Sequence, residues 1–177
     1  GVYLLNGSDG SQIGAITLSA RNIISGNTNH GIEISDTDNV TVYNNYIGLG
    51  ADGTTALPNN YGIRVDGTSS TIQIGNGAST GRNLISANSI GISIGGGSVA
   101  IHGNLIGLDE TGTIDRGNSG AGISLAGGSG EVGGDVAGEG NIISGNNYGI
   151  GISIGGFDIL ANYIGTSMDG SAAIPND

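Results

Sequence analysis

Carboxylates concentrate in three segments of the chain that could bind a cation. These eleven-residue segments, 49–59, 108–118 and 166–176, align without gaps, and each has glycine at its fifth place. Their acidic residues are Asp52, Asp109, Glu110, Asp115 and Asp169. Carboxylate oxygens suit Ca²⁺, but the spacing matches neither an EF-hand nor a nonapeptide calcium repeat. Because Asp-Gly is itself a turn signal, we expect turns here, with calcium as the one cofactor alternative and no other cofactor.

Groups suited to acid–base catalysis are few and scattered. Glycoside hydrolysis requires two carboxylates that face one cleft, and Glu33 is the only acid at the outward positions of the first strand of each repeat. Its expected neighbour in the next turn is Arg64, which predicts a cross-strand salt bridge. His30 and His102 precede glycines in different turns, and we expect them to make local hydrogen bonds. No catalytic residue is predicted.

The composition excludes several classes of protein. Glycine accounts for 38 of 177 residues, cysteine and lysine are absent, and the net charge is −11. Without a basic face the chain cannot neutralise phosphates, so we expect no nucleic-acid partner, and its charge would repel polyanions such as pectate. The lack of cysteine excludes disulfides and thiol nucleophiles. No apolar run approaches the roughly 18 residues of a membrane helix, so no membrane insertion is expected.

Two sequence motifs alternate along the chain at nearly constant spacing. The motif Asn-Ile-Ile-Ser-Gly-Asn begins at Asn22 and recurs in the same or closely related form from Asn83 and Asn141, in steps of 61 and 58 residues. Alternating with these copies, Asn-x-Ile-Gly begins at Asn45 and recurs twice, in steps of 59 and 58 residues. We therefore interpret the chain as a single domain of tandem units, 1–61, 62–121 and 122–177.

Each half of such a unit contains three short segments in which apolar and polar residues alternate. The first segment opens with glycine, as in 31–34 and 62–65; the second is exemplified by Val40 and Val42, and the third follows the motif asparagine. A period of two predicts strands, and the glycine density disfavours helices. Six halves of three strands predict an all-β parallel β-helix, a solenoid of about six turns whose coils are stacked about 4.8 Å apart.

One asparagine per turn precedes the third strand. In such a coil these side chains would lie one above another, so each amide could donate to the side-chain carbonyl of the next and satisfy polar groups that are costly to bury. Asparagine also tolerates the left-handed conformation of a sharp corner. The predicted structural ladder consists of Asn22, Asn45, Asn83, Asn104, Asn141 and Asn162.

An apolar residue follows each of these asparagines, and isoleucine follows it in turn. Strict alternation would place one of the two columns on the outside, where a lateral apolar stripe would mark a contact surface for a partner. The alternative, which we favour, is that the corner or the insertion loops cover this column. The candidate contact stripe consists of Ile23, Tyr46, Leu84, Leu105, Ile142 and Tyr163.

The motifs together resemble one known group of proteins. Ile-Gly, seven residues, Asn-Ile-Ile-Ser-Gly-Asn, then Gly-Ile-x-Ile, then Asn-x-Ile-Gly with an Asp-Gly loop, resembles bacterial right-handed parallel β-helix repeat proteins of the pectate-lyase-like fold, over nearly the whole chain. The resemblance implies a right-handed coil, in keeping with the rule for parallel crossovers, and an extracellular or cell-surface location. It implies no particular activity, because the fold carries lyases, hydrolases, epimerases and adhesins.

The catalytic patterns known in such enzymes have no counterpart here. The clustered Asp, His, Arg and Lys of polygalacturonases, and the calcium-binding acids with a basic residue of pectate lyases, are both missing from this sequence. We therefore expect a non-enzymatic extracellular structural or adhesive rod. The first alternative is a segment of a carbohydrate-active β-helix enzyme with catalytic residues largely outside this chain, acting on a neutral polysaccharide. The second is a calcium-stabilised surface protein.

The two ends of the sequence are expected to be open. Segment 57–61 leads directly into Gly62, and the closing residues 174–177 repeat its start, so that Asp177 followed by Gly1 would nearly continue the coil. No capping motif is evident at either end, although natural solenoids are capped. Two expectations follow: further repeats of a longer chain, or a filament in which the protein's partner is itself, stacked end to end.

Overall fold

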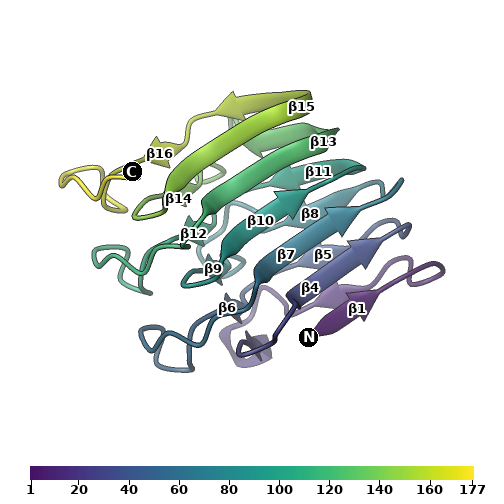
Figure 1. The fold of residues 1–177 in the computed structure, drawn as a ribbon, viewed down its shortest axis with the longest axis horizontal. Helices are drawn as coiled ribbons and strands as arrows, with labels where there is room; N and C mark the ends of the chain where they lie inside the picture. Colours follow the sequence, from purple (N-terminus) through teal and green to yellow (C-terminus); the bar gives the residue numbers. More distant parts are fainter.

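Short strands return to the same three sides of a coil, one above another along a common axis (Figure 1). The computed structural model describes residues 1–177. The strands are β1 (Val2–Leu4), β2 (Gln12–Ile13), β3 (Ile23–Ile24), β4 (His30–Ser35), β5 (Thr41–Val42), β6 (Tyr46–Ile47), β7 (Tyr61–Asp66), β8 (Ile72–Ile74), β9 (Leu84–Ile85), β10 (Ile90–Ile94), β11 (Ser98–Ile101), β12 (Leu105–Ile106), β13 (Ala121–Gly133), β14 (Ile142–Ile143), β15 (Tyr148–Leu160) and β16 (Tyr163–Ile164). The only helical element is the short 3₁₀ turn η1 (Leu18–Ala20). The predicted all-β parallel solenoid is thus confirmed.

Every rung of the coil contributes one strand to each of three columns, where a rung is one pass around the axis. The first column contains β1, β4, β7 and β10; the second contains β2, β5, β8 and β11; β13 and β15 run through both columns. The third column contains β3, β6, β9, β12, β14 and β16. Each column thus has six strands, separated by five complete returns, so the coil makes about five full turns rather than the expected six.

All neighbouring strands pair in parallel, and they keep equivalent residues opposite one another except where the register between β13 and β15 shifts, from Leu125 to Ser129. In the first column Ile32 is the partner of Ile63, and Ile63 is the partner of Ile92. Their side chains form part of an interior cluster of 21 buried residues. Because the pleat alternates, the intervening residues of the same strands face outward. The rung spacing of the sequence motifs therefore builds apolar columns along the axis.

Glycine at the start of the first column allows the rungs to approach closely. A Cβ atom added to Gly62 would lie 2.5 Å from the carbonyl oxygen of Gly91, and one added to Gly91 would lie at the same distance from that of Gly122. Distances this short do not occur for real Cβ atoms, so any side chain would force the backbones apart. The glycines that open the first segment of each half are therefore aligned along the axis, and lack of space requires glycine at this position.

Odd and even rungs, counted from residue 1, carry their loops at different corners. Odd rungs have a loop between the second and third columns, at residues 14–22, 75–83 and 134–141. Even rungs turn tightly at that corner and instead carry the insertion after the third column, closed by single antiparallel bridges such as Leu49–Ala56. The insertions project to the left in Figure 1. This alternation explains why the sequence repeats every two rungs rather than every rung.

Candidate functional site

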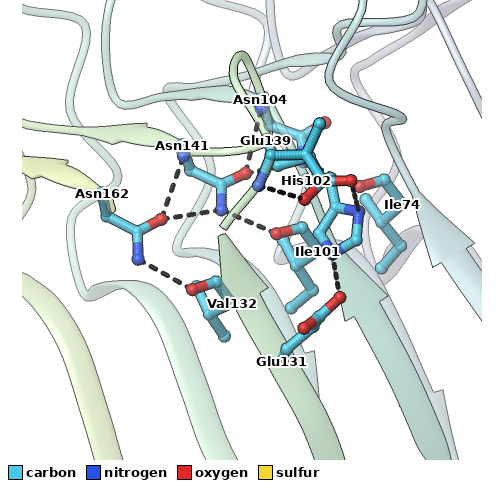
Figure 2. A network of polar contacts seen from close by, with 10 residues as sticks. Ile74, Ile101, His102, Asn104, Glu131, Val132, Glu139, Asn141 and Asn162 are labelled. Atoms are coloured by element: carbon cyan, nitrogen blue, oxygen red, sulfur yellow. Dashed lines mark hydrogen bonds and ion pairs between the residues drawn. The ribbon is translucent and has the colours of Figure 1, made fainter. Parts of the chain in front are cut away.

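The six predicted ladder asparagines form one continuous hydrogen-bonded series through the coil. Figure 2 shows its last three members: the Asn104 side-chain amide donates to Asn141 Oδ1 at 3.0 Å, and that of Asn141 donates to Asn162 Oδ1 at 2.9 Å. The Asn141 amide also donates backwards, to the main-chain carbonyl of Ile101 at 2.7 Å. In the four internal rungs both hydrogens of each ladder amide are therefore used, which satisfies the buried polar groups. The ladder prediction is confirmed.

The left-handed corner residue, however, is not the ladder asparagine. None of the six has a positive φ; the residue just before it does so in the even rungs, namely Asn44, Gly103 and Ala161, with φ of 55°, 65° and 51°. These residues make the tight even-rung corner, which lies against the loops of the neighbouring odd rungs. Asn44 shows this directly, because its main-chain N–H donates to Gly81 and its side chain donates to Thr17. The ladder positions are therefore explained by their amide bonds alone.

A second asparagine ladder, absent from the sequence prediction, runs parallel to the first. The Asn88 amide donates to Asn118 Oδ1 at 3.2 Å, and the Asn118 amide donates to Asn146 Oδ1 at 2.7 Å. Its six members are Asn27, Asn59, Asn88, Asn118, Asn146 and Asn176. In odd rungs the second-ladder residue follows the first-ladder residue by 5 positions and in even rungs by 14, because the insertion intervenes. The second ladder can be found in the sequence when the last asparagine of each insertion is aligned with the last asparagine of Asn-Ile-Ile-Ser-Gly-Asn.

The candidate contact stripe is largely covered. Tyr46, Leu84, Leu105 and Ile142 are 2–5% exposed and pack in a second apolar cluster with Leu49 and Leu108 of the insertions. Alternation is strict, so these side chains point away from the main core, but the loops lie over them. Ile23 and Tyr163, in the first and last rungs, remain 42% and 48% exposed. The lateral stripe therefore does not exist as a free surface along the rod, and its exposed members mark the two ends.

Polar groups close the outer edge of this second cluster. The Arg21 guanidinium lies 4.0 Å from the centre of the Tyr46 ring, and the Tyr46 hydroxyl donates to Glu110 Oε2 at 2.6 Å. Burial, together with the hydrogen bond to Glu110, raises the pKa of Tyr46 to about 12. Glu110, one of the calcium candidates, thus joins the insertion of the fourth rung to Tyr46 in the second rung.

The remaining calcium candidates fold back on their own loops. Asp52 Oδ1 accepts the main-chain N–H groups of Thr54 and Thr55, and Asp109 Oδ1 likewise accepts from Ile114 at 3.0 Å. Asp115 and Asp169 accept main-chain N–H groups of residues 117 and 171. These are turn-stabilising contacts. No three carboxylate or imidazole groups of the chain converge closely enough to hold a metal ion.

The expected salt bridge between Glu33 and Arg64 does not form, although the two residues are partners in the register. Glu33 Oε2 instead lies 2.8 Å from His30 Nδ1 on its own strand, and the Arg64 guanidinium pairs with Asp66. Residues two or three apart at a strand end are within reach of these long side chains, and the sequence pattern cannot rank them against the cross-strand partner. The local hydrogen bond expected for His30 is not formed, because its Nδ1 atom lies beside the Glu33 carboxylate but has no hydrogen-bond partner in the structure.

His102 occupies the tight corner of the fourth rung and is buried, with 6% of its surface exposed. Its Nε2 lies 2.7 Å from Glu131 Oε1 and its Nδ1 lies 3.8 Å from Glu139 Oε1 (Figure 2). The equivalent residue two rungs earlier is Tyr43, whose hydroxyl hydrogen-bonds Gln73 Oε1. Both corner residues therefore contact the outward position of the second column in the next rung, where His102 meets a carboxylate and Tyr43 meets an amide. The local hydrogen bond expected for His102 is not formed, because its Nε2 atom has no hydrogen-bond partner.

The outward face of the second column is hollowed into a groove with a volume of about 620 Å³. Thr41, Gln73, Ala100, Glu131 and Asp158 follow one another across it as register partners. It is lined by hydroxyl, amide and two carboxylate groups, and no basic residue borders it. The arrangement offers hydrogen bonds to a neutral ligand and no counter-charge for an anion. The sequence prediction did not include the carboxylates of Glu131 and Asp158, because only the apolar residues of the second column predicted its strands.

Comparisons with protein-family models, with curated protein sequences and with solved structures give no match. The structure also contains no helix of the length and hydrophobicity required to cross a membrane.

Proposed function

We propose that this protein is a non-enzymatic structural rod. The observation that carries the proposal is that both asparagine ladders pass through all six rungs without interruption. Most buried polar side chains are therefore used to join one rung to the next rather than gathered around a cleft. A stack of this kind derives its stability from nearest-neighbour contacts and retains its shape along its length.

The proposal also includes the location of the rod and its use. The resemblance to bacterial right-handed parallel β-helix proteins of the pectate-lyase-like fold supports an extracellular or cell-surface position, as a spacer, an adhesin stalk or a filament subunit. The net charge of −11 on 177 residues supports a role in which rods stay apart laterally, because like charges repel along their sides.

A carbohydrate-active protein is the second candidate, and the groove on the second column is the observation that favours it. Glu131 and Asp158 are adjacent in register there, so their carboxylates could face one ligand. Since the groove has no basic residue, the ligand would be a neutral polysaccharide. Against this candidate, Glu131 is paired with His102, and no aromatic side chain lines the groove for a sugar ring to stack on.

Stability, shape and activity measurements separate these candidates. The rod proposal expects chain 1–177 to resist thermolysin at temperatures just below its unfolding transition, to keep an elongated shape in small-angle scattering, and to leave neutral oligosaccharides uncleaved. Cleavage of a neutral glucan or mannan that is lost in the Glu131→Gln variant, while Glu33→Gln retains it, would establish the enzyme instead. A melting temperature lowered by EDTA would indicate the calcium-stabilised alternative.

A further inference from the structure

The ring of His102 leaves one buried nitrogen without a hydrogen bond at the edge of the groove on the second column. The residue is 6% exposed, and its Nε2 atom has no hydrogen-bond partner. Glu131, which lines the groove, places Oε1 2.7 Å from this nitrogen (Figure 2). At such a distance a hydrogen bond fails only when the oxygen lies off the direction in which an N–H would point. A buried imidazole nitrogen is therefore in contact with a carboxylate that accepts no hydrogen bond from it.

This geometry is close to that of two ligands that share one metal ion. A neutral ring nitrogen and a carboxylate oxygen both present lone pairs, so their close approach is unfavourable unless a cation joins them. Bonds of about 2.1 Å at the tetrahedral angle separate a nitrogen ligand from an oxygen ligand by about 3.4 Å. The Glu131 carboxylate would move by less than about 1 Å to reach this separation, and its side chain is 40% exposed. The pair therefore needs only a small adjustment to admit a metal ion.

A second carboxylate faces the His102 ring from its other side. Glu139 Oε1 lies 3.8 Å from Nδ1, and the Glu139 side chain is 22% exposed. Histidine ligands commonly direct their second ring N–H at a carboxylate, which fixes the tautomer and raises the basicity of the ligating nitrogen. A proton on Nδ1, next to Glu139, leaves the lone pair of Nε2 free to act as a ligand.

The charge of the groove favours a cation. Asp158 is the register partner of Glu131 in the next rung and lines the same groove, and paired strands lie about 4.8 Å apart. No basic residue borders the groove, so its carboxylates attract cations. The three groups His102, Glu131 and Asp158 do not converge in the present side-chain conformations. The site thus offers two ligands in contact, with a third carboxylate one register step away.

The other histidine makes a similar contact in different surroundings. His30 Nδ1 lies 2.8 Å from Glu33 Oε2 and also lacks a hydrogen-bond partner. Its ring, however, packs against the rings of Tyr3 and Tyr61, and Arg64 is the register partner of Glu33. A guanidinium beside the carboxylate disfavours a second cation there. His30 and Glu33 therefore provide matched controls for His102 and Glu131.

From these features we propose that His102 Nε2 and Glu131 bind a divalent transition-metal ion such as Zn²⁺ at the edge of the groove, with Asp158 and water completing the coordination. An imidazole nitrogen combined with carboxylate oxygens suits Zn²⁺, whereas Ca²⁺ takes oxygen ligands. The site is therefore distinct from the calcium alternative of the insertions. The inference goes beyond the structural role and does not depend on it, because a rod that binds no metal is still a rod.

Isothermal titration of Zn²⁺ into the chain, after treatment with EDTA and dialysis, tests the site. We expect one ion per chain, and we expect Zn²⁺ to raise the melting temperature by binding the folded state. Glu131→Gln and His102→Gln should each weaken binding at least about tenfold, and Glu139→Gln about tenfold by removing the partner of Nδ1. The controls Glu33→Gln and His30→Gln should leave the affinity unchanged.

Circular dichroism melts of every variant show whether it is folded. Because His102 is buried, its variant can fail to fold, and the half-exposed Glu131 then decides the result. No binding of Zn²⁺, or an equal loss of affinity in Glu131→Gln and Glu33→Gln, would overturn the metal site and leave the His102–Glu131 contact as an ion pair with a protonated ring. Ca²⁺ that binds as tightly as Zn²⁺, and is unaffected by Glu131→Gln, would overturn it as well. Neither result would touch the structural role, which shape and protease resistance test separately.

Discussion

The central rungs and the last rung contain the same residue pattern in different surroundings. Ile94 in the fourth rung is fully buried, while Ile152 at the equivalent place in the sixth rung is 52% exposed. In the third column, Leu105 is 2% exposed and Tyr163 is 48% exposed. Ile94 and Ile152 are both in register with Leu125, although β15 is one continuous strand whose register with β13 shifts after this position. The comparison shows that a rung does not bury its own core residues, because burial is supplied by the rung that follows.

We expect the largest difference in stability between the central rungs and the last rung for substitutions in their apolar columns. Ile94→Ala should lower the free energy of unfolding by about 3–4 kcal/mol, because it leaves a cavity among fully buried side chains. Ile152→Ala should cost about 1 kcal/mol or less at concentrations where the chain is monomeric, because much of that side chain already contacts water. Guanidinium denaturation followed by circular dichroism measures both. Equal losses would show that the last rung is covered in solution.

Substitutions in the first ladder should show the same contrast between the central rungs and the last rung, with a somewhat smaller loss in the free energy of unfolding. Asn104→Ala removes the acceptor of the Asn83 amide and the donor to the Ile74 carbonyl, both buried, and should cost about 2–4 kcal/mol. Asn162→Ala, at the open end, should cost about 1 kcal/mol. The exposed Asn6→Ala serves as a control and should leave the melting temperature unchanged. A loss at Asn104 no larger than that at Asn6 would contradict the structural role of the ladder.

Serine side chains that hydrogen-bond an odd rung to the next even rung should give a third, smaller difference in stability between buried and half-buried positions. The buried Ser86 hydroxyl donates to the Leu108 carbonyl at 2.7 Å and accepts the Gly107 N–H at 3.1 Å. Ser25 makes the equivalent contacts in the first rung, where it is half-buried. We expect Ser86→Ala to cost about 1–2 kcal/mol and Ser25→Ala about half as much. Thermal melts of the two variants are sufficient, and a reversed order would argue against burial as the cause.

Acid should produce the smallest effect, through the aspartates of the insertions. Hydrogen bonds from the Ser167 and Ser171 hydroxyls lower the pKa of Asp169 to about 2. Burial opposes the effect at Asp109, but hydrogen bonds from Ile114, Thr111 and Thr113 still hold its pKa below the usual range.

The folded state binds the protons of Asp109 and Asp169 less tightly than the unfolded state, in which aspartate has a pKa of about 3.9. The two ionised aspartates therefore stabilise the folded state above about pH 4. This stabilisation is lost as the pH falls toward about 2. The melting temperature should therefore drop over this interval, and the drop should be smaller in the variant carrying Asp109→Asn and Asp169→Asn. An unchanged acid profile in that variant would exclude these two groups as its source.

Particular residues show where sequence reasoning succeeded and where it stopped. The spacing of Asn22, Asn45 and Asn83 predicted a ladder because a coil brings equivalent positions into contact at each turn. The second ladder was missed because the insertion separates Asn45 from Asn59 by 14 residues, while Asn22 and Asn27 are only 5 apart. A pattern search that ignores variable loops cannot align positions whose separation changes from rung to rung.

The groove and the ion pairs illustrate a second kind of limit. Glu131 and His102 belong to successive rungs and come within 2.7 Å of each other, yet nothing in their spacing distinguishes this contact from the one expected between Glu33 and Arg64. Both pairs join residues of neighbouring rungs. Which long side chain reaches which partner depends on side-chain rotamers and on the local corner, and neither follows a repeat.

The amino-acid sequence by itself determined the solenoid, its strand columns, its first ladder and the glycine column, because these depend on periodic spacing and every rung repeats it. Only the tertiary structure decided that the insertions cover Leu84 and Leu105, that Glu110 bonds to Tyr46, and that Ile152 is left open. These features depend on which residues of adjacent rungs and of the insertions contact a given side chain. The position of that residue in the repeat does not determine those contacts.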